Sequence, residues 1–211
     1  MTKEHKFSLK KEVRGTIPLS NVVTEFFDSP LSIVDKDRMI MLYQLALLTK
    51  SIDGEVAEVG VYKGGTARVV ASIFSHLNKK IHLCDTFNGM PPTAPVDLHY
   101  EGAFNDVSFE EVKQYLVDYL DSVVFHVGIF PQSFENSPSK FCFVHVDCDI
   151  YQSVIDCCHF FYPKMSKGGI MLFDDYGSLS TPGAKLAVDS FCERNNIKKV
   201  YLSTGQCFIV R

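Results

Sequence analysis

The stretch VAEVGVYKGGTARVVASIFSHL, residues 56–77, decides the fold. It begins with a short apolar run, turns through glycines at 60, 64 and 65, and continues with apolar residues at helical spacing. A strand, a glycine-rich turn and a helix in this order form the first unit of a parallel α/β sheet. The glycines let the backbone turn sharply and approach a ligand before the helix begins. The turn follows neither the G-x-G-x-x-G pattern nor the phosphate-loop pattern, so by itself it predicts a tight turn as readily as a binding site.

The alternation of strand and helix continues along the chain. A helix from Ser32 to Lys50 precedes the first strand, which is predicted over 56–61. Because the later strands are continuous apolar runs, we expect a mostly parallel sheet that is buried on both faces by helices. The further predicted strands are 80–85, 122–128, 141–147, 170–175, 199–203 and 206–210, of which the last two form an antiparallel hairpin, and the further predicted helices are 66–77, 108–120, 152–165 and 183–195. We therefore predict a seven-stranded Rossmann-like α/β sandwich over residues 55–211, preceded by an N-terminal arm and helical cap over residues 1–54.

Composition excludes several classes of protein. The chain has 211 residues, of which 46% are hydrophobic and 22% charged, values typical of one globular domain. Its formal net charge is -4 and it has no long basic run, so we expect a small-molecule partner and no nucleic acid. The seven cysteines form no C-x-x-C pair, which favours buried, reduced thiols. The polar N-terminus and the absence of a stretch of about 20 apolar residues predict a cytoplasmic protein without a membrane partner.

Acidic residues lie at the ends of the predicted strands, where ligands bind in open parallel sheets. Glu58 lies two residues before Gly60, where it can meet the positive end of the next helix or the ammonium group of a ligand. Asp85 ends the second strand, a position from which an acid accepts hydrogen bonds from a ribose diol. Together with the glycines, these two acids predict an adenosine ligand without a phosphate requirement. S-adenosylmethionine fits that description better than NAD.

A second acidic group follows the fourth and fifth predicted strands. Asp147 and Asp149 come after the fourth strand, and Asp174 and Asp175 end the fifth. If the two strands are neighbours, these carboxylates converge, and such a cluster needs a cation to stay ionised. Oxygen ligands of this kind suit Mg²⁺, with Mn²⁺ as a substitute. The alternative is that single aspartates cap helices or turns.

Five segments of the chain carry a family resemblance: AEVGVYKGGTA (57–67), CDTFNGMPP (84–92), GIFPQSF (128–134), FVHVDCDIYQSV (143–154) and YPKMSKGGIMLFDDYG (162–177). They resemble the macrocin O-methyltransferase (TylF/MycF-type) family of S-adenosylmethionine-dependent methyltransferases, which includes enzymes that act on sugar hydroxyls of antibiotics. The resemblance implies a class I methyltransferase sandwich. It also implies metal coordination by Asp147, Asp174 and Asp175, and Asp149 as the general base. Family members have more helices before the first strand, so the resemblance leaves the acceptor open.

The expected activity is S-adenosylmethionine-dependent, Mg²⁺-assisted methylation of a hydroxyl on a small molecule, such as a sugar or another natural product. Two alternatives stay open: a non-catalytic S-adenosylmethionine-binding protein, and a nicotinamide-dependent oxidoreductase of the same fold, for which no Tyr-x-x-x-Lys pair lies in the expected place. A homodimer is compatible with the sequence. His99 could face the substrate, although a solvated loop histidine is the preferred interpretation, and His82, His126 and His145 are interpreted as packed strand residues. The candidate cofactor-binding residues are Glu58, Gly60, Tyr62, Gly64, Gly65, Thr66, Asp85, Thr86, Gly128, Ser133 and Asp147.

Overall fold

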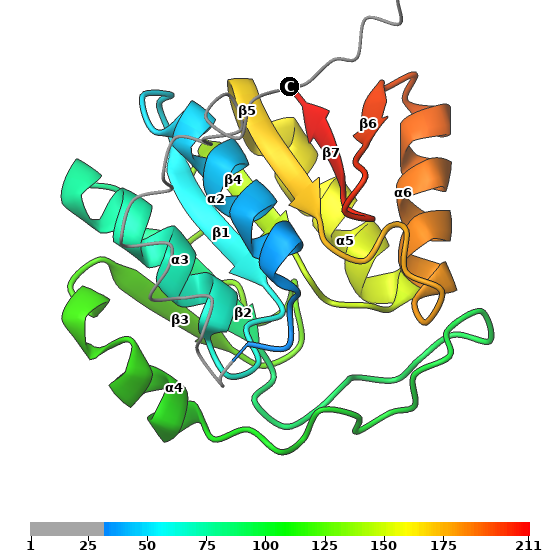
Figure 1. Ribbon diagram of the computed structural model, residues 1–211, viewed down its shortest axis with the longest axis horizontal. Coiled ribbons are helices and arrows are strands. Elements are labelled where there is room, and N and C mark those ends of the chain that lie inside the picture. The colour runs from blue at the N-terminus through cyan, green and yellow to red at the C-terminus, as the bar shows by residue number, and fades with distance from the viewer. Residues whose placement is uncertain (1–31) are drawn as a thin grey trace, which may run out of the picture.

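The computed structural model describes residues 32–211 (Figure 1). Residues 1–31 of the predicted N-terminal arm and helical cap lie outside this range. The helices are α2 (Lys36–Thr49), α3 (Gly65–Phe74), α4 (Phe109–Tyr115), α5 (Tyr151–Phe161) and α6 (Pro182–Arg194). The strands are β1 (Glu55–Val59), β2 (Ile81–Asp85), β3 (Val123–Val127), β4 (Phe141–Val146), β5 (Met165–Phe173), β6 (Lys199–Tyr201) and β7 (Cys207–Val210).

The strands form one seven-stranded sheet in the order β3-β2-β1-β4-β5-β7-β6. The four neighbouring pairs β3–β2, β2–β1, β1–β4 and β4–β5 are parallel. Strand β7 pairs antiparallel with both β5 and β6, which closes the sheet with the expected hairpin. The predicted fold class is therefore confirmed. The order reverses between β1 and β4, because the chain crosses from β3 at one edge to the far side of β1, and this is where ligands bind in such sheets.

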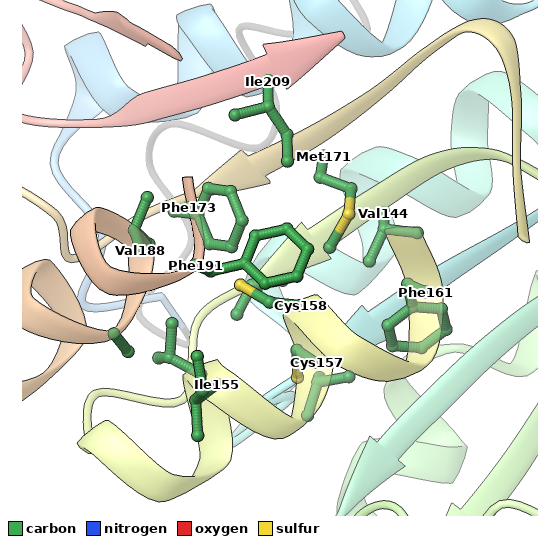
Figure 2. Close-up of a cluster of buried hydrophobic side chains, with 14 of the residues drawn as sticks. Val144, Ile155, Cys157, Cys158, Phe161, Met171, Phe173, Val188, Phe191 and Ile209 are labelled. Carbon is green, nitrogen blue, oxygen red and sulfur yellow. The ribbon is translucent and has the colours of Figure 1, made fainter. Parts of the chain in front are cut away.

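Helices cover both faces of the sheet, as the continuous apolar strands predict. Helices α2 and α3 lie on one face, and α5 and α6 on the other (Figure 1). Figure 2 shows the second face, where Phe191 of α6 lies beside Met171 and Phe173 of β5, and Phe161 of α5 belongs to the same buried cluster. Burial of such large side chains stabilises a fold by about 1.5–3 kcal/mol each. All seven cysteines are free, and six of them are buried, which agrees with the expected reduced thiols.

Strand β5 begins earlier than the sequence predicts. The expected helix 152–165 ends at Phe161 and is followed by a 3₁₀ turn at Tyr162–Lys164, which contains Pro163. Proline has no N–H to continue the helical hydrogen bonds, so the chain leaves the helix here. Met165 then pairs with Phe141 of β4, and the strand passes through an irregularity before its regular pairing resumes. Periodicity assigned Met165 to the helix, and this assignment was wrong.

A long segment, residues 86–108, connects β2 to α4 and runs along the carboxyl edge of the sheet toward α6 (Figure 1). Asp97 fixes its middle: one carboxylate oxygen accepts from Ala94 N, and the other accepts from Tyr151 N at the start of α5. Near its end, Asp106 accepts from Tyr62 Oη and Lys63 Nζ. The segment is therefore tied to the sheet edge at two places. Among the described residues, no helix is both long and apolar enough to cross a membrane.

Candidate active site

A cavity of about 270 Å³ opens at the carboxyl ends of the strands, beside the point where the strand order reverses. The first βα turn lines one part of it, and the residues after β4 and β5 line another. Ser32, Ile33 and Val34 also contribute to its wall, and so do Met90 and Pro91 of segment 86–108. Elements far apart in the sequence thus share one space, large enough for part of a ligand of cofactor size.

The glycine-rich turn passes very close to β4. A Cβ atom on Gly60 would lie 1.8 Å from the carbonyl oxygen of Asp147, and Gly60 has φ +90°. Only glycine tolerates both the contact and the backbone conformation. Gly60 therefore lets the turn lie against the residue that follows β4, so that both face the cavity.

Asp85 organises the same turn through backbone hydrogen bonds. Its Oδ2 accepts from Val61 N at 2.7 Å and from Tyr62 N at 2.8 Å, and its Oδ1 accepts from Phe87 N at 2.7 Å. Asp85 also lines the cavity, and a carboxylate oxygen has two lone pairs. The side chain of Asp85 can therefore hold the turn and still accept a hydrogen bond from a hydroxyl group of a ligand.

Glu58 lies beneath the turn and does not line the cavity. It is fully buried, and its Oε1 accepts from Thr66 Oγ1 at 2.6 Å. Its Oε2 lies 3.7 Å from Nδ1 of His145, whose Nε2 lies 3.5 Å from Oδ1 of Asp174. Burial acts to lower the pKa of His145, but Asp174 and Glu58 outweigh burial and raise that pKa well above its usual value. His145 is packed beneath the cavity between Glu58 and Asp174, as predicted for a strand residue.

Four aspartates converge where β4 and β5 end, because these strands are neighbours. Asp174 and Asp175 are buried, and Asp147 and Asp149 are partly exposed to the cavity. Burial raises the pKa of Asp147 and Asp149 well above the usual range, and the nearby charges of Asp174 and Asp175 add to the effect. Burial and Asp174 also raise the pKa of Asp175, to about 6. Burial and mutual repulsion therefore oppose full ionisation of these carboxylates unless a cation lies nearby.

Arg38 of α2 lies among these carboxylates, a contact that sequence reasoning missed. Its Nη2 forms an ion pair with Oδ2 of Asp174, donates to the carbonyl oxygen of Asp174 at 2.8 Å, and lies 3.4 Å from Oδ1 of Asp175. Gln206 holds the other oxygen of Asp174, with its Nε2 donating at 2.6 Å. Burial acts to raise the pKa of Asp174, but His145 and Arg38 outweigh it, so that pKa lies below its usual value.

Asp149 follows β4 in a left-handed backbone conformation, with φ +59°. Its N–H donates to Oδ2 of Asp175 at 3.3 Å, which brings the two strand ends together. Its Oδ1 lies 4.0 Å from Nε2 of His99, which packs against Phe104 in segment 86–108. His99 is half-buried and lines the cavity, which agrees with the alternative of a substrate-facing residue and not with the preferred interpretation as a solvated loop histidine. A loop position gives no periodic signal that would predict this orientation.

Most candidate site residues line the cavity, but three do not. Glu58 lies beneath the turn, as described above. Gly64 is the N-cap residue of α3, has φ +86° and faces Val112. Ser133 packs behind Gly128 and donates to its carbonyl oxygen at 3.3 Å. The candidates that line the cavity are Gly60, Tyr62, Gly65, Thr66, Asp85, Thr86, Gly128, Asp147, Asp149, Asp174 and Asp175.

Comparison with known sequences identifies the family. The sequence profile of the macrocin-O-methyltransferase (TylF) family matches residues 25–204, most of the chain. The chain belongs to this family. The TylF-family chain is 29% identical over 160 residues to demethyldecarbamoylnovobiocin O-methyltransferase of Streptomyces niveus. That match covers 69% of this chain and 60% of the relative.

A second relative is the 8-demethyl-8-(2,3-dimethoxy-alpha-L-rhamnosyl)-tetracenomycin-C 4'-O-methyltransferase of Streptomyces olivaceus. It is 28% identical over 145 residues, which cover 62% of this chain and 56% of the relative. The TylF-family chain thus spans less than two thirds of both curated relatives. Among solved structures, the O-methyltransferase NovP has a TM-score of 0.75 at 24% identity, covering 87% of this chain and 83% of NovP. NovP therefore has the same fold.

Proposed function

We propose that this TylF-family chain transfers a methyl group from S-adenosylmethionine to a hydroxyl oxygen of a small molecule, such as a sugar or another natural product. One observation carries the proposal. The glycine-rich turn with Asp85 and the aspartates that follow β4 and β5 line the same cavity. A cofactor held by the turn would then lie beside an acceptor held at the aspartates. Family membership and the O-methyltransferase relatives support the same reaction.

The turn and Asp85 form the cofactor end of the proposed site. The close approach of Gly60 to β4 leaves room for a ligand against the backbone, and Asp85 offers an acceptor for ribose hydroxyls. S-adenosylmethionine supplies a methyl group on a positively charged sulfur. The aspartates favour that positive charge in the cavity, because opposite charges attract strongly where water is scarce.

Asp149 is the proposed general base beside the hydroxyl that receives the methyl group. It lines the cavity, and its backbone is fixed by the hydrogen bond to Asp175. A hydroxyl that gains a methyl group must lose its proton, and a carboxylate placed beside it can take that proton. His99, whose Nε2 lies 4.0 Å from Oδ1 of Asp149, is a candidate for orienting that carboxylate.

The carboxylates also suit a divalent cation. Ligand atoms of His145, Asp147 and Asp174 lie within 4.8 Å of one another, and Asp175 is adjacent in sequence to Asp174. Carboxylate oxygens are the donors that Mg²⁺ and Mn²⁺ prefer. Asp147, Asp174 and Asp175 are the proposed ligands. When bound, the cation would act as a Lewis acid and a template for acceptor oxygens.

The test is methyl transfer by the purified protein. The protein is incubated with S-adenosylmethionine and a panel of glycosides, free sugars and catechols, with Mg²⁺ or with a chelator, and methylated products are detected by mass spectrometry. We expect product from at least one hydroxylated acceptor, and less of it with the chelator. The matched variants are Asp149→Asn, which should lose turnover, and Asp118→Asn, an exposed aspartate outside the cavity, which should keep it.

Calorimetry separates the proposal from its alternatives. S-adenosylmethionine should bind and NAD should not. Binding of NAD with hydride transfer would favour the oxidoreductase. Tight binding of S-adenosylmethionine without transfer to any acceptor in the panel would favour the non-catalytic binding protein.

A further inference from the structure

Arg38 occupies an unusual position in the carboxylate site. The described residues that line the cavity include five aspartates, at 85, 147, 149, 174 and 175. The only lysine or arginine among them is Arg38. Its guanidinium lies against Asp174 and Asp175, two of the three carboxylates proposed to hold a divalent cation. The arginine and the cation would therefore contact the same oxygens.

The contact of Arg38 with the aspartates is incomplete as an arginine–carboxylate pair. The hydrogen bonds that Arg38 donates to Asp174 and Asp175 all come from one nitrogen, Nη2, whereas the strongest pairs use two nitrogens on two oxygens. The Nε of Arg38 is buried and has no hydrogen-bond acceptor among residues 32–211. The side chain is also 20% exposed, so it has a route to solvent. These features describe a counter-ion that a stronger cation can displace.

We infer that Arg38 is a displaceable counter-ion that competes with the divalent cation for Asp174 and Asp175. In the absence of the cation, Arg38 offsets part of the negative charge of Asp174 and Asp175. Binding of the cation requires the guanidinium to leave Oδ2 of Asp174. This inference rests on the metal half of the proposed function.

The competition also involves the N-terminal end of α2. Gln206 Nε2 donates both to Oδ1 of Asp174 and, at 3.2 Å, to the carbonyl oxygen of Arg38. Ser32, Ile33 and Val34, which precede α2, line the cavity. Displacement of Arg38 would therefore change the cavity wall as well as the charge. Cation binding and the arrangement of this wall become linked.

The test is Mn²⁺ affinity, followed by the electron paramagnetic resonance signal of free Mn²⁺ without S-adenosylmethionine. Arg38→Gln removes the competing charge and should bind Mn²⁺ at least about tenfold more tightly than the wild type, since close charge pairs commonly contribute more than 1.4 kcal/mol. Arg38→Lys keeps the charge and should bind more weakly than Arg38→Gln. Arg68→Gln is the matched control: it makes the same change in net charge, and Arg68 pairs with Asp118 outside the cavity. Its affinity should equal that of the wild type.

Each outcome bears separately on the inference and on the proposed cation. Equal or weaker Mn²⁺ binding by Arg38→Gln, with clear binding by the wild type, would overturn the competition and leave the cation site standing. Binding by Arg38→Gln alone would support the competition and refute metal use by the wild-type protein. No binding by either protein would overturn both.

A second measurement uses the wild-type protein, in case Arg38→Gln does not fold. The Nε–H signals of arginine side chains are followed by ¹⁵N NMR during titration with Mg²⁺, with the Arg38 signal assigned through Arg38→Lys. The Arg38 signal should shift and exchange faster with water as Mg²⁺ binds, and the Arg68 signal should not change. An Arg38 signal that stays constant at saturating Mg²⁺ would contradict displacement.

Discussion

Asp85→Ala separates two roles that the structure gives to one side chain. The substitution removes the acceptor of three backbone amides, at Val61, Tyr62 and Phe87. Water in the cavity can replace part of each bond, so about 1 kcal/mol per bond is a reasonable net loss, or about 3 kcal/mol together. For a domain of this size the melting temperature falls by about 2–4 °C per kcal/mol, which predicts a decrease of about 6–12 °C. The domain should stay folded at 25 °C, because such domains have about 5–15 kcal/mol of stability.

The same substitution should weaken S-adenosylmethionine binding by about 1–3 kcal/mol, or about 5- to 150-fold in Kd, because ribose hydroxyls lose their acceptor. Calorimetry gives the affinity, and thermal unfolding gives the stability. Asp97→Ala is the control: Asp97 accepts from the backbone amides of Ala94 and Tyr151 but does not line the cavity. It should lose stability and keep cofactor affinity. Wild-type affinity in a destabilised Asp85→Ala protein would refute the ribose contact, and an unchanged melting temperature would refute the account of the turn.

Three further substitutions test other parts of the site and the fold. Asp149→Asn should lower turnover by about 10²–10⁴-fold with unchanged S-adenosylmethionine affinity, measured with the acceptor found in the panel; wild-type turnover would exclude it as the base. Gly60→Ala should destabilise the protein strongly, because its Cβ would lie 1.8 Å from the carbonyl oxygen of Asp147; a melting temperature near the wild-type value would contradict that contact. Burial and the neighbouring His82 lower the pKa of His126, so protonation of this histidine favours the unfolded chain. The neutral side chain therefore stabilises the fold fully above about pH 6.5, and this stabilisation is lost as the pH falls through the folded-state pKa. Between pH 8 and pH 5 the wild type should lose more stability than His126→Gln, and parallel pH curves would contradict this.

The fold was predictable because its signals are local. A buried parallel strand appears as a continuous apolar run, and the positive φ of the turn at Gly60 is a local backbone requirement that favours glycine. The ends of strands were harder to predict. Met165 is apolar in either a helix or a strand, and only its pairing with Phe141, which is remote in sequence, decides between them. The sheet itself resolves that choice.

The carboxylate site was predictable for a different reason. Topology rules bring the ends of parallel strands to one edge, so Asp147 and Asp174 could be expected to meet once β4 and β5 were neighbours. The rule places strand ends but does not orient side chains. Glu58 illustrates the difference: it lies in β1, two residues before Gly60, yet its side chain faces Thr66 beneath the cavity. Alternation along a strand that is buried on both faces gives no signal for which face is which.

Arg38 marks the limit of reasoning from local pattern. An acidic cluster requires a compensating charge, and this requirement could be stated from the sequence alone. The chain has 21 lysines and arginines, and Arg38 is separated by 136 residues from Asp174, so no spacing rule selects it. Its place depends on how α2 packs against the sheet, which is decided by the apolar residues of the helix rather than by Arg38. The same argument implies that the charge partner can change while the fold stays the same. A relative that packs its first helix in this way but has a neutral residue at this position should depend more strongly on a bound divalent cation for stability.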